Sequence, residues 1–134
     1  MTAAQLAEIY AHARAAFPAE CCGYASDAGV VRCTNAWQDP GRGTDTAFAI
    51  DGAELFAFAR SFDGPAPARV VYHSHTNGRA YFSALDRAVA VAGGAPAYPV
   101  EHLVVGVTAE RVVEAARFAW DGADYVEVAR WSVP

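Results

Sequence analysis

The stretch VVYHSHTNGRAYFSALDRA, residues 70–88, passes from a run of β-branched and aromatic residues to a run of helix formers. It predicts a strand that ends near His75, a seven-residue loop over 76–82, and a helix that begins after Ser83. Residues i and i+2 of a strand face the same side, so His73 and His75 point together while Ser74 points away. Two imidazoles are therefore expected side by side at the carboxyl end of a strand.

The helix that follows brings a carboxylate to the same place. Ser83 has the character of an N-cap, which puts Asp86 in the first helical turn, and the loop is long enough to carry this turn back over the strand end. His73, His75 and Asp86 then offer two nitrogens and one oxygen with a fourth position free for water, as in a catalytic zinc site. Ser-x-x-Asp is also a capping box, and His-x-His occurs by chance, but the combined spacing favours the metal.

A zinc hydrolase also needs a general base, and Glu is the usual residue. Glu20 stands in FPAECCGY, after the first expected helix and at the start of a strand. The small apolar residues that follow place it at the edge of the core, where the pKa of a carboxyl rises. Glu8, Glu54 and Glu101 are alternatives, although Glu8 and Glu54 lie on expected helices where a solvated face explains them.

The rest of the chain alternates strands with helices, which indicates an α/β or α+β fold with a mixed sheet. Thr2 is expected to cap the first helix, Asp51 and Glu54 to form a capping box on the second, and Asp121–Gly122 to turn the last hairpin. Helices are predicted over 3–16, 52–62 and 83–92, and strands over 21–26, 29–35, 47–50, 69–75, 102–108, 111–119 and 124–131.

Size and composition fit one domain, residues 1–134, since 54% of the 134 residues are hydrophobic. The net charge is −5 and all ten basic residues are arginine, a poor basis for binding nucleic acid.

No run suits a membrane span, and the N-terminus lacks a signal-peptide pattern. The odd number of cysteines (Cys21, Cys22, Cys33) does not suit a disulfide framework. We expect a soluble cytoplasmic protein with no membrane or nucleic-acid partner.

The chain fills every position of one known signature. The signature consists of Glu20, the His-Ser-His at 73–75, seven further residues, and Ser83-x-x-Asp86. In these positions the chain resembles the JAMM metalloprotease family, also called MPN+ or Mov34/PAD-1 domains. The resemblance continues through most of the chain, in ECCGY (20–24), YHSHTNGRAYFSALD (72–86), AYPVEHLVVGV (97–107) and RFAWDGADYVEV (117–128).

The resemblance implies a mixed, mainly antiparallel β-sheet flanked by about three helices, in a cytidine deaminase-like architecture. It implies one zinc ion per chain on His73, His75 and Asp86, with Glu20 as general base and Ser83 as the hydroxyl that stabilises the oxyanion. The family usually has proline directly after the second histidine and directly before the serine. Here these positions hold Thr76 and Phe82, which is expected to loosen the loop without removing a ligand.

Members of this family hydrolyse peptide or isopeptide bonds beside the C-terminal Gly-Gly of ubiquitin or ubiquitin-like proteins. This chain has no room for the insertions with which larger relatives clasp ubiquitin, and it resembles the compact bacterial members that act with small ubiquitin-like sulfur carriers. The implied reaction is release of cysteine, or trimming of residues beyond Gly-Gly, from such a carrier. We also consider a homodimer.

Three other classes of protein share some of these features. A catalytically silent MPN-type scaffold that binds partners is the main alternative, although such relatives typically lack the zinc ligands. A zinc nucleobase deaminase needs His-x-Glu and Pro-Cys-x-x-Cys, and neither occurs. A DNA-repair-associated relative carries His-x-His-Pro, which Thr76 and the acidic charge oppose.

The remaining conspicuous residues have plainer interpretations. Cys21 and Cys22 are expected to be small buried hydrophobes. His102 is interpreted as a polar edge residue and not a fourth ligand, and His12 as a surface residue. Trp37 and the 37–46 loop are either one wall of a groove that takes a carrier's extended tail by strand addition, or an ordinary ordered loop.

Overall fold

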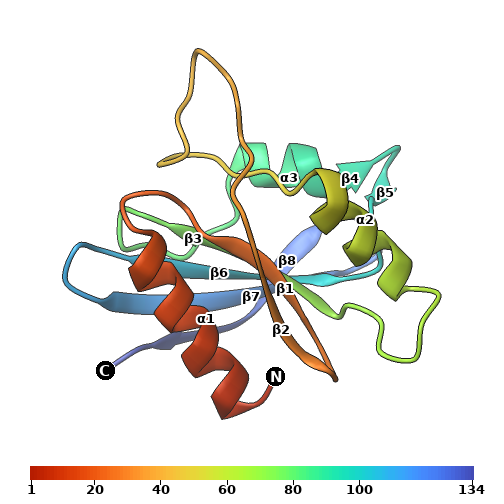
Figure 1. Ribbon diagram of the computed structural model, residues 1–134, viewed down its shortest axis with the longest axis horizontal. Helices are drawn as coiled ribbons and strands as arrows, with labels where there is room; N and C mark the ends of the chain where they lie inside the picture. Colours follow the sequence, from red (N-terminus) through yellow and green to blue (C-terminus); the bar gives the residue numbers. More distant parts are fainter.

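The computed structural model describes all residues, 1–134, and contains three helices and two sheets (Figure 1). The helices are α1 (Ala3–Ala16), α2 (Gly52–Ser61) and α3 (Ala84–Ala90). None of them has the length and apolarity needed to cross a lipid bilayer. The main strands are β1 (Cys22–Ser26), β2 (Gly29–Cys33), β3 (Val70–His75), β6 (Glu101–Val107), β7 (Val112–Trp120) and β8 (Tyr125–Ser132).

The main sheet has the strand order β2-β1-β3-β6-β7-β8. Every neighbouring pair is antiparallel except β3 and β6, which run parallel. The predicted α+β class, with a mixed and mainly antiparallel sheet and three helices, is confirmed. Because β3 lies between β1 and β6, His73 is flanked by Cys22 on one side and Val104 on the other. The histidine strand is thus an interior strand, where its side chains are shielded from water.

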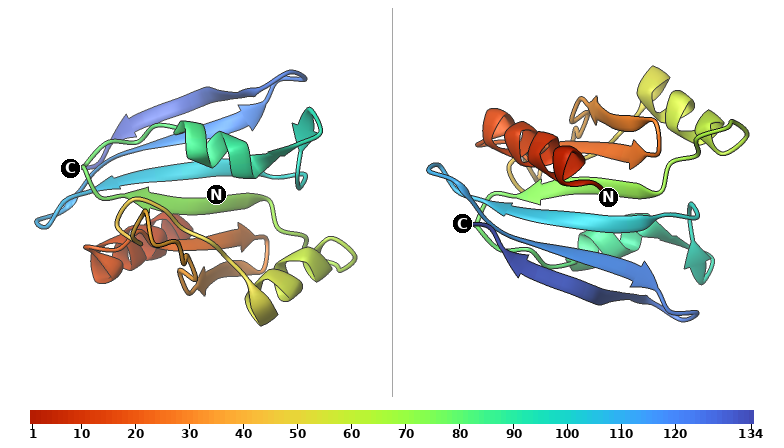
Figure 2. Two further views of the ribbon diagram at one scale, coloured as in Figure 1. Left: turned by 90° about the horizontal axis from the view of Figure 1, so that it is seen from above. Right: turned by 90° about the horizontal axis from the view of Figure 1, so that it is seen from below.

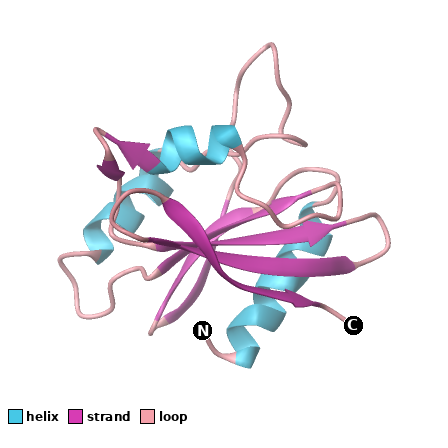
Figure 3. Cartoon of the chain, turned by 180° about the vertical axis from the view of Figure 1, so that it is seen from behind, coloured by secondary structure: helices cyan, strands magenta, loops and turns pink.

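The helices cover opposite faces of the sheet, α1 one face and α2 and α3 the other (Figures 2 and 3). Ile9 of α1 packs with Tyr72 and Leu103 in one hydrophobic cluster, while Phe58 of α2 packs with Val71 in another. Alternation along β3 therefore places Tyr72 and Ser74 on the α1 side. His73 and His75 face the side of α2 and α3, as the spacing predicts.

Two of the three expected helix caps form. Thr2 caps α1 and Ser83 caps α3, each in a reciprocal capping box. The capping box expected from Asp51 and Glu54 is wrong. Asp51 makes no side-chain cap, and the Glu54 carboxylate instead accepts a hydrogen bond from the backbone N–H of Thr34 at 2.9 Å. A tertiary contact has taken the carboxylate that the local pattern assigned to the helix end.

The prediction of a strand over 47–50 is wrong, because this segment pairs with no strand of either sheet. One backbone hydrogen bond, from the N–H of Ala36 to the C=O of Ala49, is its only backbone pairing. The helix predicted over 83–92 ends early, at Ala90. The next residues form a small hairpin of β4 (Val91–Ala92) and β5 (Ala95–Pro96), which turns through Gly93 and Gly94 at positive φ.

Gly106 of β6 lies where the backbone of the loop after β3 packs closely on the sheet. A Cβ at this position would lie 2.5 Å from the carbonyl carbon and oxygen of Gly78 and 2.7 Å from the backbone nitrogen of Arg79. These are backbone atoms that cannot rotate away. Gly106→Ala should therefore lower the free energy of unfolding by about 2 kcal/mol or more in a denaturant titration. Gly64→Ala is the control, since its Cβ would meet only ordinary contact distances, and equal stability of both variants would contradict the packing.

Candidate metal centre and active site

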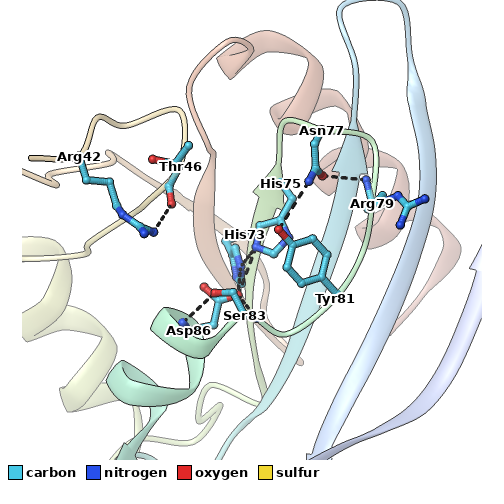
Figure 4. Close-up of polar contacts among 9 residues, drawn as sticks. All are labelled: Arg42, Thr46, His73, His75, Asn77, Arg79, Tyr81, Ser83 and Asp86. Carbon is cyan, nitrogen blue, oxygen red and sulfur yellow. Dashed lines mark hydrogen bonds and ion pairs between the residues drawn. The ribbon is translucent and has the colours of Figure 1, made fainter.

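The end of β3 and the start of α3 bring three polar side chains together, as the sequence predicts for His73, His75 and Asp86 (Figure 4). The two imidazole Nε2 atoms are 3.1 Å apart. Asp86 Oδ2 lies 3.1 Å from Nε2 of His73 and 3.2 Å from Nε2 of His75. The three atoms form a nearly equilateral triangle, and all three side chains are buried.

The dimensions of this triangle suit a metal ion. Zinc binds nitrogen and oxygen at 2.0–2.1 Å, so adjacent ligands of a tetrahedral site are roughly 3.3 Å apart. If the imidazole protons reside on Nδ1, three lone pairs face one another across the triangle, a repulsive arrangement that a cation would relieve. If they reside on Nε2, both imidazoles can donate to Asp86 Oδ2, and in either tautomer the buried Nδ1 atoms have no partner. The residues present therefore fit a bound metal.

The pKa values of these groups favour the ligating forms. Burial lowers the pKa of His73, so its imidazole stays neutral. For Asp86, burial alone would raise the pKa, but hydrogen bonds from His73, His75 and the backbone N–H of Ser83 hold it well below the usual range. Zinc binding needs an ionised carboxylate and neutral imidazoles whose proton lies on Nδ1, in place of the Nε2–H that donates to Asp86.

Aromatic side chains hold both imidazoles in place. The ring of Phe48 stacks on His73 with centroids 4.4 Å apart, and Tyr81 packs on His75 at the same distance. Phe48 comes from the segment after the 37–46 loop, and Tyr81 from the loop between β3 and α3. The rings limit both rotation of the imidazoles and the approach of water.

The Ser83–Asp86 capping box is part of the same cluster. The backbone N–H of Ser83 donates to Asp86 Oδ2 at 2.9 Å, and the N–H of Asp86 donates to Ser83 Oγ at 3.0 Å. The oxygen that caps α3 is thus the one that faces the imidazoles. The capping and ligand interpretations of Asp86, which are alternatives in the sequence, are both satisfied by one conformation.

Glu20 lies beside the triangle and is buried, just before the start of β1. A carboxylate oxygen of Glu20 and a nitrogen of each of His73 and His75 all lie within 4.8 Å of one another. Burial, reinforced by the negative charge of Asp86, raises the pKa of Glu20 to about 8. A carboxyl in this range is suited to exchanging protons near neutral pH.

Two hollows meet at the cluster. A polar cleft of about 560 Å³ is lined by Glu20, His75 and Ser83 together with residues of the 37–46 loop. An apolar slot of about 190 Å³ opens on the other side of the cluster and is lined by Trp37, Phe48 and Tyr98 among others, with His73 and Asp86 on one wall. A substrate in the polar cleft would lie against His75, and one in the apolar slot would lie against His73 and Asp86.

The loop between β3 and α3 is anchored without the prolines usual in the family. Thr76 Oγ1 donates to the carbonyl of Asp45 at 2.9 Å, which ties this loop to the 37–46 loop. Phe82 packs among His102, Phe118 and Tyr125, with ring centroids 5.1–5.5 Å away. These contacts restrain the loop, and the loosening expected from the loss of the prolines stays a prediction.

Two other histidines differ from expectation. The prediction of His12 as a surface residue is wrong: it is half-buried, and its Nδ1 lies 2.7 Å from the hydroxyl of Tyr72. The prediction of His102 as an edge residue is also wrong, because β6 is an interior strand and His102 is 8% exposed. It lines the apolar slot without joining the triangle, and its Nδ1 has no partner. Cys21 and Cys22 are buried and free, as expected for small hydrophobes.

Asn35 is a site residue that sequence reasoning missed. Its side-chain NH₂ donates to the carbonyls of Glu20 at 3.0 Å and Ala47 at 2.9 Å, with a longer contact to Thr44. Its Oδ1 accepts from the backbone N–H groups of Trp37 and Ala49. The Asn35 amide thus connects the backbone of Glu20, which lines the polar cleft, to Trp37 and Ala49, which line the apolar slot. A polar residue just after a strand carries no local signal for such a role.

Fold and site together define a JAB-type α+β domain with a buried group able to hold a metal ion. Residues 2–121 match the family model of the prokaryotic homologs of the JAB domain, and the chain therefore belongs to this family. The resemblance to JAMM/MPN proteins is thereby confirmed at the level of the family. The comparison with curated proteins gave no match.

Two solved structures support the fold. A solution structure of a protein from Desulfitobacterium hafniense shares 26% identity, with 94% of this chain and 88% of that chain covered, at a TM-score of 0.61. A solution structure of a protein from Salinibacter ruber shares 23% identity, with 96% and 87% covered, at a TM-score of 0.56. The second likeness is one of fold alone.

The role of Asn35 can be tested by an isosteric change. Asn35→Asp keeps the acceptor but leaves the carbonyls of Glu20 and Ala47 facing a carboxylate, so it should lower the free energy of unfolding by about 1–3 kcal/mol. Hydrogen exchange should also accelerate at the amide of Glu20, which donates to Thr44. Asn77→Asp, on the exposed loop after β3, is the control and should change neither. A fully stable Asn35→Asp protein would remove Asn35 from this role.

The buried imidazole of His102 should make stability depend on pH. Burial lowers its pKa to about 3, whereas a histidine in the unfolded chain titrates near 6.5. Its neutral form therefore contributes fully above pH 6.5, and the contribution is lost as the pH falls because only the unfolded chain takes up the proton. Relative to His102→Gln, the wild-type protein should lose roughly 1.4 kcal/mol of unfolding free energy per pH unit between pH 6 and 4. Parallel stability curves would contradict the burial.

Proposed function

We propose that this protein is a zinc-dependent peptidase that hydrolyses the bond after the C-terminal Gly-Gly of a small ubiquitin-like sulfur carrier. It would release cysteine or trim the residues beyond the glycines. The observation that carries the proposal is the buried triangle of His73 Nε2, His75 Nε2 and Asp86 Oδ2, with the Glu20 carboxyl beside it. Two imidazole nitrogens, one carboxylate oxygen and an adjacent acid–base group are the parts of a catalytic zinc site.

His73, His75 and Asp86 would hold the zinc ion. Bound there, zinc would lower the pKa of a water molecule and polarise the carbonyl to be cleaved. The protein contributes a fixed geometry, because the aromatic rings and the capping box hold all three ligands before the ion binds.

Glu20 is the proposed general base. Its carboxylate takes a proton from the attacking water and returns it to the nitrogen of the leaving group, so that the amine departs neutral. Beside a cation in the triangle, the pKa of Glu20 would fall from about 8 toward neutrality. Its backbone is fixed on both sides, since its N–H donates to Thr44 and its C=O accepts from Asn35.

Ser83 is proposed to stabilise the oxyanion. Its Oγ already accepts a hydrogen bond from the N–H of Asp86, so its own proton is left to donate toward the polar cleft that it lines. A donor aimed at the carbonyl oxygen gains strength as negative charge develops there.

The carrier tail has a suitable path beside the triangle. The segment 47–50 lies outside the helices and sheets, and the backbone of Phe48 makes no hydrogen bond within the chain. An incoming extended tail could pair with it as an added strand, which supports the groove interpretation of this region. Gly-Gly at the cleavage point would let the tail backbone approach the buried ligands closely.

The compartment and the assembly remain parts of the proposal. All three cysteines are free and buried, which is compatible with a reducing environment and supports a cytoplasmic location. The carrier is the proposed partner, and a homodimer stays a prediction.

Intact-mass spectrometry of a sulfur carrier that ends in Gly-Gly-Cys tests this function. We expect loss of the mass of one cysteine residue on incubation with zinc-loaded protein, and none after chelation. Glu20→Gln should retain zinc but lose cleavage by about 10²-fold or more, since it removes the proton acceptor. His75→Ala should lose both, because it removes a ligand. An intact carrier in the presence of zinc-loaded protein would instead favour a catalytically silent scaffold.

A further inference from the structure

The polar cleft contains a cationic side chain to which the mechanism above gives no task. Arg42 lies on the 37–46 loop and lines the cleft with Glu20, His75 and Ser83. Its side chain makes one hydrogen bond, from Nη1 to the carbonyl of Thr46 at 3.2 Å (Figure 4), and it forms no ion pair. Most of the guanidinium donors are therefore free to meet a ligand.

The position of Arg42 relative to the site is set by several contacts. The indole N–H of Trp37 donates to its carbonyl at 3.0 Å, and its own backbone N–H donates to Asp39 at 3.3 Å. Two residues further on, the carbonyl of Thr44 accepts from the N–H of Glu20 at 2.8 Å. The loop carrying Arg42 is thus bonded directly to the proposed base. The positive charge of Arg42 also acts to lower the pKa of Glu20.

The two substrate types of this family differ in charge on the released side of the bond. An isopeptide or an internal peptide bond presents an uncharged backbone there. A bond to the last residue of a chain presents that residue's α-carboxylate, one residue from the bond that breaks. A guanidinium with free N–H groups binds such a carboxylate through paired, charge-assisted hydrogen bonds.

We propose that Arg42 binds the α-carboxylate of the released residue, so that the protein acts as a carboxypeptidase on tails that end one residue beyond the cleaved bond. This inference rests on the proposed peptidase function. In the reaction, the C–N bond breaks, the oxygen of water joins the carbonyl carbon, and the proton held by Glu20 goes to the leaving nitrogen. The products are a shortened carrier with a new carboxylate and one free amino acid.

The cleft also carries an opposing charge. Asp45 lines it and is exposed, and its carboxylate would repel an incoming α-carboxylate. Arg42 is then needed to offset this repulsion as well as to bind. Loss of Arg42 should affect substrates with a free terminal carboxylate and spare those without one, which a merely structural role would not do.

The test compares two carrier tails, Gly-Gly-Cys with a free carboxylate and Gly-Gly-Cys with a terminal amide. Wild-type protein should cleave the acid with a kcat/KM about tenfold above that of the amide. Arg42→Gln should bring the ratio close to one by slowing the acid alone, and Arg42→Lys should fall between. Arg79→Gln is the matched control, because Arg79 is an exposed, unpaired arginine outside this cleft. An unchanged ratio in Arg42→Gln would overturn the inference.

A binding measurement separates this inference from the peptidase function. Zinc-loaded Glu20→Gln should bind the acid tail about tenfold more tightly than the amide, and adding Arg42→Gln should abolish the difference. Selective binding without any cleavage by wild-type protein would keep the role of Arg42 and reject the peptidase. Cleavage of both tails at equal rates, with equal binding, would reject the role of Arg42 and keep the peptidase. If the acid tail is neither bound nor cleaved, both the role of Arg42 and the peptidase function are rejected.

Discussion

The carboxylate of Asp86 is the group around which the end of the sheet is arranged. A charge this far from water is unfavourable unless hydrogen bonds or counter-charges replace its hydration. The N–H of Ser83 and the two imidazoles of His73 and His75 supply these contacts, and all three are directed at Asp86 Oδ2. The cap that starts α3 therefore also fixes the helix over the end of β3. Local helix geometry and the metal-binding triangle depend on one another through this oxygen.

The sheet supplies the rigidity that such a site requires. Ser74 exchanges two hydrogen bonds with Cys21, because its Oγ accepts from the Cys21 N–H at 2.8 Å and its N–H donates to the Cys21 carbonyl at 3.1 Å. This pairing extends the β1–β3 ladder up to the residue beside Glu20. Asn35 holds Glu20 from the other side. The proposed base is thus placed by the strand that carries the ligands and by the loop that lines the clefts, which is the kind of support that keeps catalytic groups in register.

The sequence predicts the parts of this structure that follow from short-range periodicity. The shared side of His73 and His75 and the cap at Ser83 come from strand alternation and turn chemistry. Three of the failures have a common cause, since each depends on a partner far away in the chain. The segment 47–50 has strand character but no strand to pair with, Glu54 leaves its helix end for Thr34, and His102 enters the core because β6 is an interior strand. Four of the five hydrogen bonds of Asn35 join it to residues nine or more positions away, which no spacing rule connects.

If the triangle of two Nε2 atoms and one carboxylate oxygen is a metal site, zinc must bind there through nitrogen and oxygen alone. Zinc K-edge X-ray absorption of the zinc-loaded protein measures this, because imidazole, oxygen and sulfur ligands scatter differently. We expect one zinc per chain with a first shell of nitrogen and oxygen at about 2.0–2.1 Å and the outer-shell pattern of two imidazoles. A first shell that contains sulfur, from Cys21, Cys22 or Cys33, or one without imidazole, would contradict it.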